Sequence, residues 1–168
     1  DEAYTIIRTT LDVAPKTELW MNLGEIELRR GRLAAARDAF RTVVDRESGN
    51  DRALAALGLT AAQLGDRVAA KKALDQALEN NGTLFEARVV RAQLAIADGE
   101  TTTALQHLQR ALQVRPDDPW ATGWQGIAYL GAGNLGAASD RLGAAVRAGR
   151  TTFSLPYAEV LRRQGRAT

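Results

Sequence analysis

A set of small and apolar residues returns every thirty-four positions along the sequence, and this interval limits the possible folds more than any other feature. The set first occurs as Gly24, Gly31, Ala36 and Phe40. It returns as Gly58, Gly65, Ala70 and Leu74, then as Ala92, Gly99, Ala104 and Leu108, and finally as Gly126, Gly133, Ala138 and Leu142. The chain has 15 glycines, so three further glycines on the phase of Gly31 would occur by chance in roughly one sequence in a thousand. Four copies in phase therefore indicate four copies of one structural unit.

Each copy has the pattern of two consecutive helices. In the first copy, the apolar spacing predicts one helix over about 17–30 and a second over about 33–47, with Gly31 between them. The glycines at 31, 65, 99 and 133 predict a backbone with positive φ, because the chain reverses there and glycine adopts that conformation at least cost. Small residues inside the first helix of each copy predict another helix crossing close by, since glycine is otherwise unfavourable there. These residues are Gly24, Gly58, Ala92 and Gly126.

The phase divides the chain into four full units and a half unit at each end. The full units span 17–50, 51–84, 85–118 and 119–150. Residues 1–15 match a second helix that ends at Pro15. Residues 151–168 match a first helix, with Ala158 at the small position, Leu161 at a buried one and Gly165 at the junction. We expect a chain that opens and closes inside a unit to be part of a longer array, and its start at Asp1 leaves room for a removed targeting segment.

Three helix starts carry capping signals. Thr17 can accept a hydrogen bond from the unpaired N–H groups of the first helix. Thr83 and Glu86 have the spacing of a capping box. Asp118 followed by Pro119 places a cap before a proline at the first helical position, where the missing proline N–H costs nothing. We therefore expect helices to start at these three places.

The composition favours an all-α protein and narrows the classes of partner. Hydrophobic residues make up 45% of the chain but aromatic residues only 5%, and 31 residues are alanine, so the interior must form from close helix contacts. The net charge is +2 and the charges are mixed along the chain, so nucleic acid is not indicated as a partner. No apolar run approaches the roughly 18 residues of a membrane span. Of the 22 basic residues 19 are arginine, which suggests a bacterial genome of high GC content.

The residues of catalysis are scarce, and we expect no enzyme, no cofactor and no metal. The chain has no cysteine, so neither disulfides nor thiolate metal sites can form. His107 is the one histidine, and we expect it on an exposed surface without a catalytic role. The carboxylates are scattered and match no hydrolase spacing. The sequence therefore favours binding over chemistry.

The repeat resembles the tetratricopeptide repeat. The resemblance rests on Trp20, Leu23-Gly24, Gly31, Ala36, Phe40 and the prolines that follow second helices, Pro15 and Pro116. It covers nearly the whole chain. Departures from the pattern are Arg91 and Gln125 in the large apolar column, Arg88 and Thr122 at the position of Trp20, and Glu27 at the position of Ala61, Ala95 and Tyr129.

The charged departures each have two interpretations. Glu27 is either a buried acid paired with an arginine or an exposed residue, and we expect exposure because a buried unpaired carboxylate is costly. Arg88 and Arg91 lie one helical turn apart and could bind an anion. We expect instead that their aliphatic stems pack along the helix while the guanidinium groups stay in water.

The resemblance implies a single array, a right-handed α-solenoid of antiparallel helix pairs whose first helices line a concave groove for an extended peptide or a partner's helix. The implied groove residues with side chains that can recognise a partner are Met21, Asn22, Glu25, Leu28, Leu59, Val89, Gln93, Ile96, Trp120, Trp124 and Ile127. Ala55, Ala56, Ala62, Val90 and Gly131 complete the same face. One form of the family binds a C-terminal carboxylate with a lysine, and Met21, Ala55 and Val89 take that position here, so we do not expect this chemistry.

Trp120 and Trp124 are the most distinctive residues of the implied groove. With Ile127 and Gly131 they form one stripe on one helical face. The stripe could be core packed against neighbouring helices, or Trp120 could cover the loop near Pro116. Large exposed aromatic side chains usually meet a partner, so we expect at least one of the two to anchor an apolar partner segment.

We therefore interpret the chain as a scaffold that binds a protein or peptide segment. Similar bacterial arrays act in cell-envelope assembly and secretion, for example in pilus assembly, so we expect a periplasmic or envelope location. The alternative is a structural spacer within a longer periplasmic array of an exopolysaccharide or cellulose export protein. The half units could also pair two copies of the chain. The sequence does not identify the partner.

Overall fold

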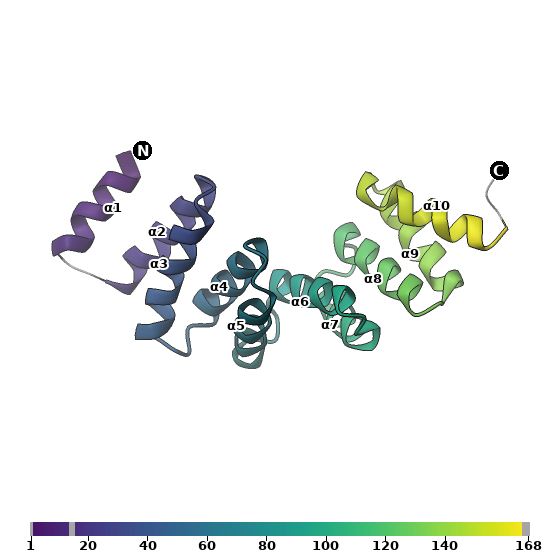
Figure 1. Cartoon of the computed structure of the whole chain (residues 1–168), viewed down its shortest axis with the longest axis horizontal. Helices are drawn as coiled ribbons and strands as arrows, with labels where there is room; N and C mark the ends of the chain where they lie inside the picture. Colours follow the sequence, from purple (N-terminus) through teal and green to yellow (C-terminus); the bar gives the residue numbers. More distant parts are fainter. Residues whose placement is uncertain (1, 14–15, 166–168) are drawn as a thin grey trace. The chain divides into compact units, whose positions relative to one another are not determined.

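The computed structural model describes residues 2–13 and 16–165. All regular secondary structure in these residues is helical. Figure 1 shows the helices in sequence order from purple to yellow. They are α1 (Glu2–Val13), α2 (Thr17–Arg29), α3 (Leu33–Arg46), α4 (Asp51–Gln63), α5 (Arg67–Asn80), α6 (Phe85–Ala97), α7 (Thr101–Val114), α8 (Pro119–Gly131), α9 (Leu135–Arg147), the 3-10 turn η1 (Thr151–Phe153) and α10 (Ser154–Arg163). The predicted all-α repeat fold is confirmed, while Pro15 lies outside the described residues.

The contacts divide the chain into two compact units, residues 1–87 and 88–168. In the first unit α2 packs against α3, α4 packs against both α3 and α5, and α1 packs against α2. In the second unit α8 packs against α7 and α9, and α10 packs against α9. Each described helix pair thus shares an interface with the next one in its unit, as expected for stacked repeats.

The predicted junction glycines all have positive φ. The angle is 72° at Gly31, 81° at Gly65, 77° at Gly99 and 75° at Gly133. At the first junction the N–H of Arg32 donates to the carbonyl of Glu27 at 2.9 Å, and the N–H of Gly31 donates to Leu28 at 3.0 Å. This pair of bonds is the Schellman motif, which satisfies the last carbonyls of a helix and needs a left-handed residue. The same bonds recur at the other three junctions.

The predicted close approach of helices at the mid-helix glycines is also confirmed. A Cβ added at Gly24 would lie 2.4 Å from the ring of Phe40. At Gly58 it would lie 2.7 Å from Leu74, and at Gly126 it would lie 2.6 Å from Leu142. No real Cβ contact is that short, so a large side chain of the second helix fills the space that each glycine leaves.

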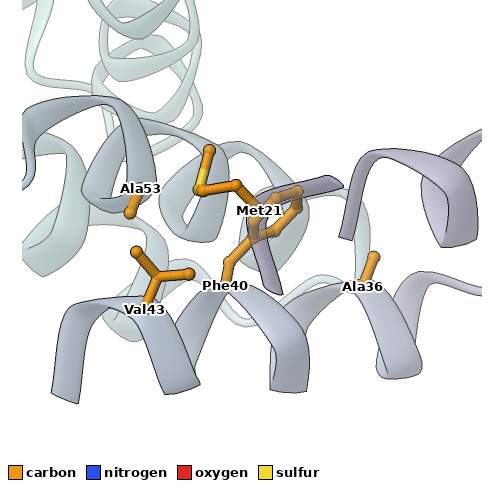
Figure 2. Packing of buried hydrophobic residues seen from close by; sticks show 5 residues of the cluster. All are labelled: Met21, Ala36, Phe40, Val43 and Ala53. Carbon is orange, nitrogen blue, oxygen red and sulfur yellow. The ribbon is translucent and has the colours of Figure 1, made fainter. Parts of the chain in front are cut away.

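The large side chains opposite these glycines form the cores of the two units. In the first unit Phe40 and Val43 of α3 lie against Met21 of α2 and Ala53 of α4 (Figure 2). Phe40 is completely buried, which contributes roughly 1.5–3 kcal/mol. In the second unit Leu142 packs in the same way with Phe153 and Val160. One pairing of small and large residues therefore repeats in both cores.

The capping predictions succeed at one helix start and fail at two. Asp118 accepts from the N–H of Ala121 at 2.8 Å, with Pro119 at the start of α8, as predicted. Thr17 is already inside α2, which starts without a cap from any side chain, so that prediction is wrong. Thr83 lies two residues before α6, and its hydroxyl donates to Asn81 at 2.7 Å, so the capping box is also wrong. The Thr17 side chain forms a hydrogen bond with Glu47, and the Thr83 side chain forms one with Asn81.

The last helix differs from the expected register. Ala158 is exposed and Leu161 is half-buried, so neither packs as predicted, while Val160 is completely buried. Phe153 in η1 is buried two helical turns before Val160, and these two residues set the buried face. Gly165 has φ of 69°, as the junction prediction requires.

Candidate partner-binding surface

In the first unit the predicted groove residues lie on α2 and α4 and differ in exposure. Met21 is 8% exposed and Ala55 is 9% exposed, so both offer little surface to a partner. Asn22 is exposed. The remaining predicted residues are half-buried: Glu25, Leu28, Ala56, Leu59 and Ala62. The surface available for binding is therefore a mixture of one amide, one acid and aliphatic side chains.

An ion pair between Glu25 of α2 and Arg52 of α4 links the two first helices of this unit. The two residues are 27 positions apart, and the sequence pattern did not predict their contact. Arg52 is largely exposed, so solvent screens the pair and its contribution to stability is small. The contact places the Glu25 carboxylate beside α4 on the predicted face.

A pocket of about 220 Å³ lies on this face between α1 and α2. Two of its residues, Asn22 and Glu25, were predicted from the sequence. Ile7 of α1 and Ile26 and Arg29 of α2 complete it, and these three were not predicted from the repeat pattern. The walls offer an amide, a carboxylate, a guanidinium group and two apolar side chains. This combination can bind both the backbone and the side chains of a polypeptide.

In the second unit the predicted residues of α6 are largely covered. Val89 is 3% exposed, and Val90, Gln93 and Ile96 are half-buried. Gly131 at the end of α8 is exposed. Three of the predicted residues on α6, Val90, Gln93 and Ile96, therefore keep some accessible surface.

Trp120 and Trp124 pack together with Phe153 and are half-buried, as is Ile127. The ring centroids of the two indoles are 5.9 Å apart with planes at 80°, and Phe153 lies 5.4 Å from Trp120 and 5.9 Å from Trp124. These are edge-to-face and tilted contacts, which stabilise aromatic pairs. Both tryptophans thus contribute to the core of the second unit. Binding of a partner by either indole stays a prediction.

Phe153 was not among the predicted site residues, although the sequence holds a signal for it. A Cβ added at Gly123 would lie 2.1 Å from the Phe153 ring, so Gly123 provides the space that this ring occupies. Gly123 falls between the two tryptophans but outside the repeated glycine columns. A glycine beside two indoles, off the repeat phase, indicates that another large side chain packs there.

The expected exposure of Glu27 is wrong. Its residue exposure is 3%, and the guanidinium groups of Arg30 and Arg32 lie 3.7 Å and 3.9 Å from its carboxylate. Arg30 also lies over the ring of Tyr4, 4.2 Å from the centroid. The alternative interpretation, a buried acid paired with arginine, is correct because two cations compensate the charge.

Two other polar residues are less exposed than expected. Arg88 is only 6% exposed, so the expectation of a solvated guanidinium group is wrong for this residue. Its burial, together with the nearby positive charge of Arg110, lowers the pKa of Arg88. His107 is half-buried instead of exposed. In the described part of the chain no three His, Cys, Asp or Glu side chains come together as metal ligands, and no helix there could span a membrane.

Comparison with solved structures shows the same fold in several bacterial proteins. MamA 41-end from Desulfovibrio magneticus RS-1 is 22% identical; the match covers 89% of this chain and 86% of that MamA chain, with a TM-score of 0.81. YrrB is 15% identical, and the match covers 95% of this chain and 84% of YrrB with a TM-score of 0.80. TTC0263 from Thermus thermophilus is 20% identical, and the match covers 90% of this chain and 84% of TTC0263 with a TM-score of 0.71. Comparison with curated protein sequences gave no significant match.

Comparison with protein families identifies the repeat itself. A tetratricopeptide repeat model matches residues 1–52 and 55–119, and a second tetratricopeptide repeat model matches residues 95–166. The first match covers more than half of the chain, and the two together extend over nearly all of it. The repeated glycine turns and the paired cores described above agree with these matches. The chain belongs to the tetratricopeptide repeat family.

Proposed function

We propose that this chain is a protein-interaction scaffold that binds an extended segment of a partner polypeptide on the face formed by α2 and α4. The observation that carries the proposal is the pocket of about 220 Å³ in which Asn22 and Glu25 meet Ile7 of α1. Tetratricopeptide repeat proteins are in general non-enzymatic scaffolds for protein or peptide partners, which supports binding over catalysis.

The chemistry of the face suggests the kind of segment that it binds. Asn22 offers an amide donor and an amide acceptor, which match the backbone carbonyl and N–H groups of an extended peptide. Leu59 and the small Ala56 and Ala62 leave room for partner side chains on α4. Glu25 is already paired with Arg52, and Arg29 adds one positive charge at the pocket. A segment of apolar and uncharged polar residues with one acidic side chain suits these properties best.

One solved neighbour supports peptide binding on this fold. YrrB is described as a tetratricopeptide repeat protein with an unusual peptide-binding site. It is only 15% identical to this chain, so it supports binding by the fold and not the same peptide.

We also propose that the interaction serves cell-envelope assembly or secretion in a bacterium, with the chain in the periplasm or envelope. The support is the arginine-rich composition and the bacterial origin of similar folds. The alternative, a spacer within a longer export array, differs in its consequence: its function would depend on repeat number and not on the side chains of α2 and α4. Sequencing of the full-length gene separates the two, because many more repeats followed by an outer-membrane domain would favour the spacer.

The binding proposal can be tested with peptides selected from a random display library against the purified protein. The double variant Asn22→Arg with Leu59→Glu changes one exposed and one half-buried residue of the face. Loss of the amide contacts and introduction of charge should weaken the selected peptides about tenfold or more. Isothermal titration calorimetry gives the affinities.

A matched control keeps the same kind of substitutions on another surface. Gln76→Arg with Val68→Glu places them on α5, where Gln76 is exposed and Val68 is 82% exposed. This control should bind the peptides as the unchanged protein does. Equal affinity of both double variants would show that α2 and α4 do not form the binding face.

A further inference from the structure

A pocket of about 250 Å³ in the first unit lies between α3 and α5 and contains none of the predicted groove residues. Val44 of α3, Leu57 of α4 and Ala69 of α5 line it and are half-buried. Leu54 of α4 and Ala73 of α5 also line it, with exposures of 2% and 5%. This pocket, called the α3–α5 groove below, therefore has an apolar floor to which all three helices contribute.

The same positions of the preceding repeat line a pocket of about 270 Å³ between α1 and α3. Its residues Trp20, Leu23, Ala35, Asp38 and Ala39 precede Leu54, Leu57, Ala69, Lys72 and Ala73 by thirty-four positions. The stacking of repeats thus produces the groove, and the residue types at these positions decide what it can bind. From the first pocket to the second, an indole is replaced by an aliphatic side chain and an acid by a lysine.

The rim of the α3–α5 groove carries two cations and one anion, a net charge of +1. Arg41 and Asp45 of α3 and Lys72 of α5 are all exposed. None of the three forms an ion pair within 4 Å with another described residue. The neighbouring acid of α3, Asp38, is already paired with Arg37 at 2.8 Å. Both cations of the rim are therefore available to a carboxylate of a partner.

Floor and rim together narrow the class of ligand. A nucleic acid needs several cations along its phosphates or aromatic rings for its bases, and the described residues that line the groove provide two cations and no aromatic ring. The volume of about 250 Å³ lies below the roughly 300–1,000 Å³ of small-molecule pockets and suits one or two side chains. An aliphatic side chain beside a carboxylate matches both floor and rim, and a polypeptide offers this pair in adjacent residues.

We propose that the α3–α5 groove binds a segment of a partner polypeptide in which an aliphatic residue stands next to an acidic one. The aliphatic side chain packs on Leu57 and Ala69, and the carboxylate pairs with Arg41 and Lys72. This surface is separate from the proposed face of α2 and α4, so the scaffold can hold two segments at once.

The probe is the peptide acetyl-Ser-Leu-Glu-Ser-amide, added to protein with ¹³C-labelled valine and leucine methyl groups. The methyl signals of Val44 and Leu57 should shift and saturate, and the affinity is taken from these two signals alone. Leu155 in the second unit is 84% exposed and lies outside the groove, so its signal should stay in place as the internal control. No saturable shift of Val44 and Leu57 overturns the proposal.

Three analogues of the probe separate the two contacts. Alanine in place of the leucine removes the aliphatic side chain, while glutamine or lysine in place of the glutamate removes or reverses the charge. Each replacement should weaken binding about threefold or more, and lysine should weaken it most. Equal or tighter binding of the lysine peptide contradicts the proposed carboxylate contact, and equal binding of the alanine peptide contradicts the aliphatic one.

Substitutions at the rim test the signs of the charges. Arg41→Gln with Lys72→Gln should weaken the probe about fivefold and remove its preference for glutamate over glutamine. Asp45→Asn should strengthen binding about twofold, because it removes the one repelling charge of the rim. All three side chains are exposed, and circular dichroism checks that the fold is kept. Equal affinities of the double variant and Asp45→Asn would overturn the proposal.

A matched pair of substitutions tests the floor. Ala69→Leu fills the groove from α5 and should abolish the saturable shift of Leu57. Ala35→Leu makes the same change thirty-four residues earlier, in the pocket between α1 and α3, and should leave the affinity unchanged. Equal affinities of the two variants would place the probe outside the α3–α5 groove.

Two double variants separate this groove from the face of α2 and α4. Asn22→Arg with Leu59→Glu should leave the affinity of the probe unchanged, because neither residue lines the groove. Gln76 does line it. A library peptide that responds to Gln76→Arg with Val68→Glu, but not to Asn22→Arg with Leu59→Glu, therefore binds in the α3–α5 groove. Loss of the probe in the Asn22→Arg with Leu59→Glu variant would overturn the proposal.

Discussion

Gly24 of α2 lies directly against the ring of Phe40 of α3, and a Cβ at position 24 would lie 2.4 Å from that ring. Leu74 and Leu142 occupy the corresponding places against Gly58 and Gly126. A glycine of the first helix against a large side chain of the second helix is therefore the contact that recurs in these three repeats.

The substitution Gly24→Ala should destabilise the protein by about 1–3 kcal/mol, because the added methyl group would overpack the contact with Phe40. Urea unfolding followed by circular dichroism measures the loss. Gly136→Ala is the control, since the nearest atom to its added Cβ is 3.8 Å away and alanine is the better helix former there. The control should be neutral or stabilising. A stable Gly24→Ala protein would show that α2 and α3 can separate at little cost.

The junction glycines allow a test in which no packing of side chains is involved. Gly65 has φ of 81°, and nothing lies within 4 Å of its added Cβ. Gly65→Ala should therefore cost about 1–2 kcal/mol through backbone strain alone. Gly49 also has open space around it but is not in the left-handed region, so Gly49→Ala should change the unfolding free energy by less than about 0.5 kcal/mol. Equal effects of the two substitutions would contradict the assigned turn.

The buried carboxylate of Glu27 should depend on its two arginines. The double variant Arg30→Met with Arg32→Met leaves the acid buried without compensation, and it should destabilise the protein by about 3–5 kcal/mol. Adding Glu27→Leu to that background should restore most of the stability, because no buried charge remains. Chemical denaturation of the unchanged protein, the double variant and the triple variant gives the coupling free energy between Glu27 and the two arginines. Additive effects of the substitutions would show that the three residues do not interact.

The carboxylate of Glu159 should titrate far below the ordinary range. Hydrogen bonds from Arg162 and Arg163 lower its pKa from 4.5 to about 2. A lowered native pKa means that the stabilisation is complete above the unfolded value and is lost as the pH falls from about 4.5 to about 2. Carbon-detected NMR titration of Glu159 measures the pKa directly.

The titration has a matched control. Arg162→Gln with Arg163→Gln should return the pKa of Glu159 toward 4.5, because both donors and both positive charges are lost. Arg67→Gln removes one exposed arginine on α5 and should leave the pKa of Glu159 at about 2. A low pKa that persists without Arg162 and Arg163 would contradict the assigned cause.

Phe153 should be essential to the core of the second unit. Phe153→Ala would leave a cavity beside Trp120 and Trp124 and should destabilise this unit by about 3–5 kcal/mol. Leu155→Ala, two residues later on an 84% exposed side chain, should change stability by less than about 0.5 kcal/mol. Thermal unfolding followed by near-ultraviolet circular dichroism measures the stability of both variants. A neutral Phe153→Ala would show that the indoles pack without this ring.

The sequence predicts the parts of the fold that depend on backbone conformation and close approach. Positive φ at Gly31 and the helix crossing at Gly24 follow from residue type and phase alone, because few residues other than glycine satisfy either requirement. The repeat phase also holds cap positions beyond the predicted Asp118. Asn50 caps α4 at the position that Asp118 has before α8, and Asp66 and Asn134 cap α5 and α9 at equivalent positions before second helices.

The candidate site was less predictable because its properties depend on contacts between side chains distant in the sequence. Exposure of Glu27 was predicted because a buried carboxylate is costly. The prediction was wrong, since residue type and repeat phase do not show that Arg30 and Arg32 both lie against this acid. The contact of Glu25 with Arg52 and the place of Ile7 in the pocket depend on how α1, α2 and α4 pack. The repeat pattern alone does not determine such contacts.

The closure of each junction by backbone hydrogen bonds has a consequence for how such a protein can change in length. Because the N–H groups of Gly31 and Arg32 bond only to carbonyls, the turn requires a glycine and no particular neighbour. A duplicated stretch that begins and ends at equivalent junctions would meet the existing helices with the same small and large residues. Growth or shortening by whole units is therefore compatible with every existing interface, whereas the loss of a few residues inside a unit would put all following contacts out of register.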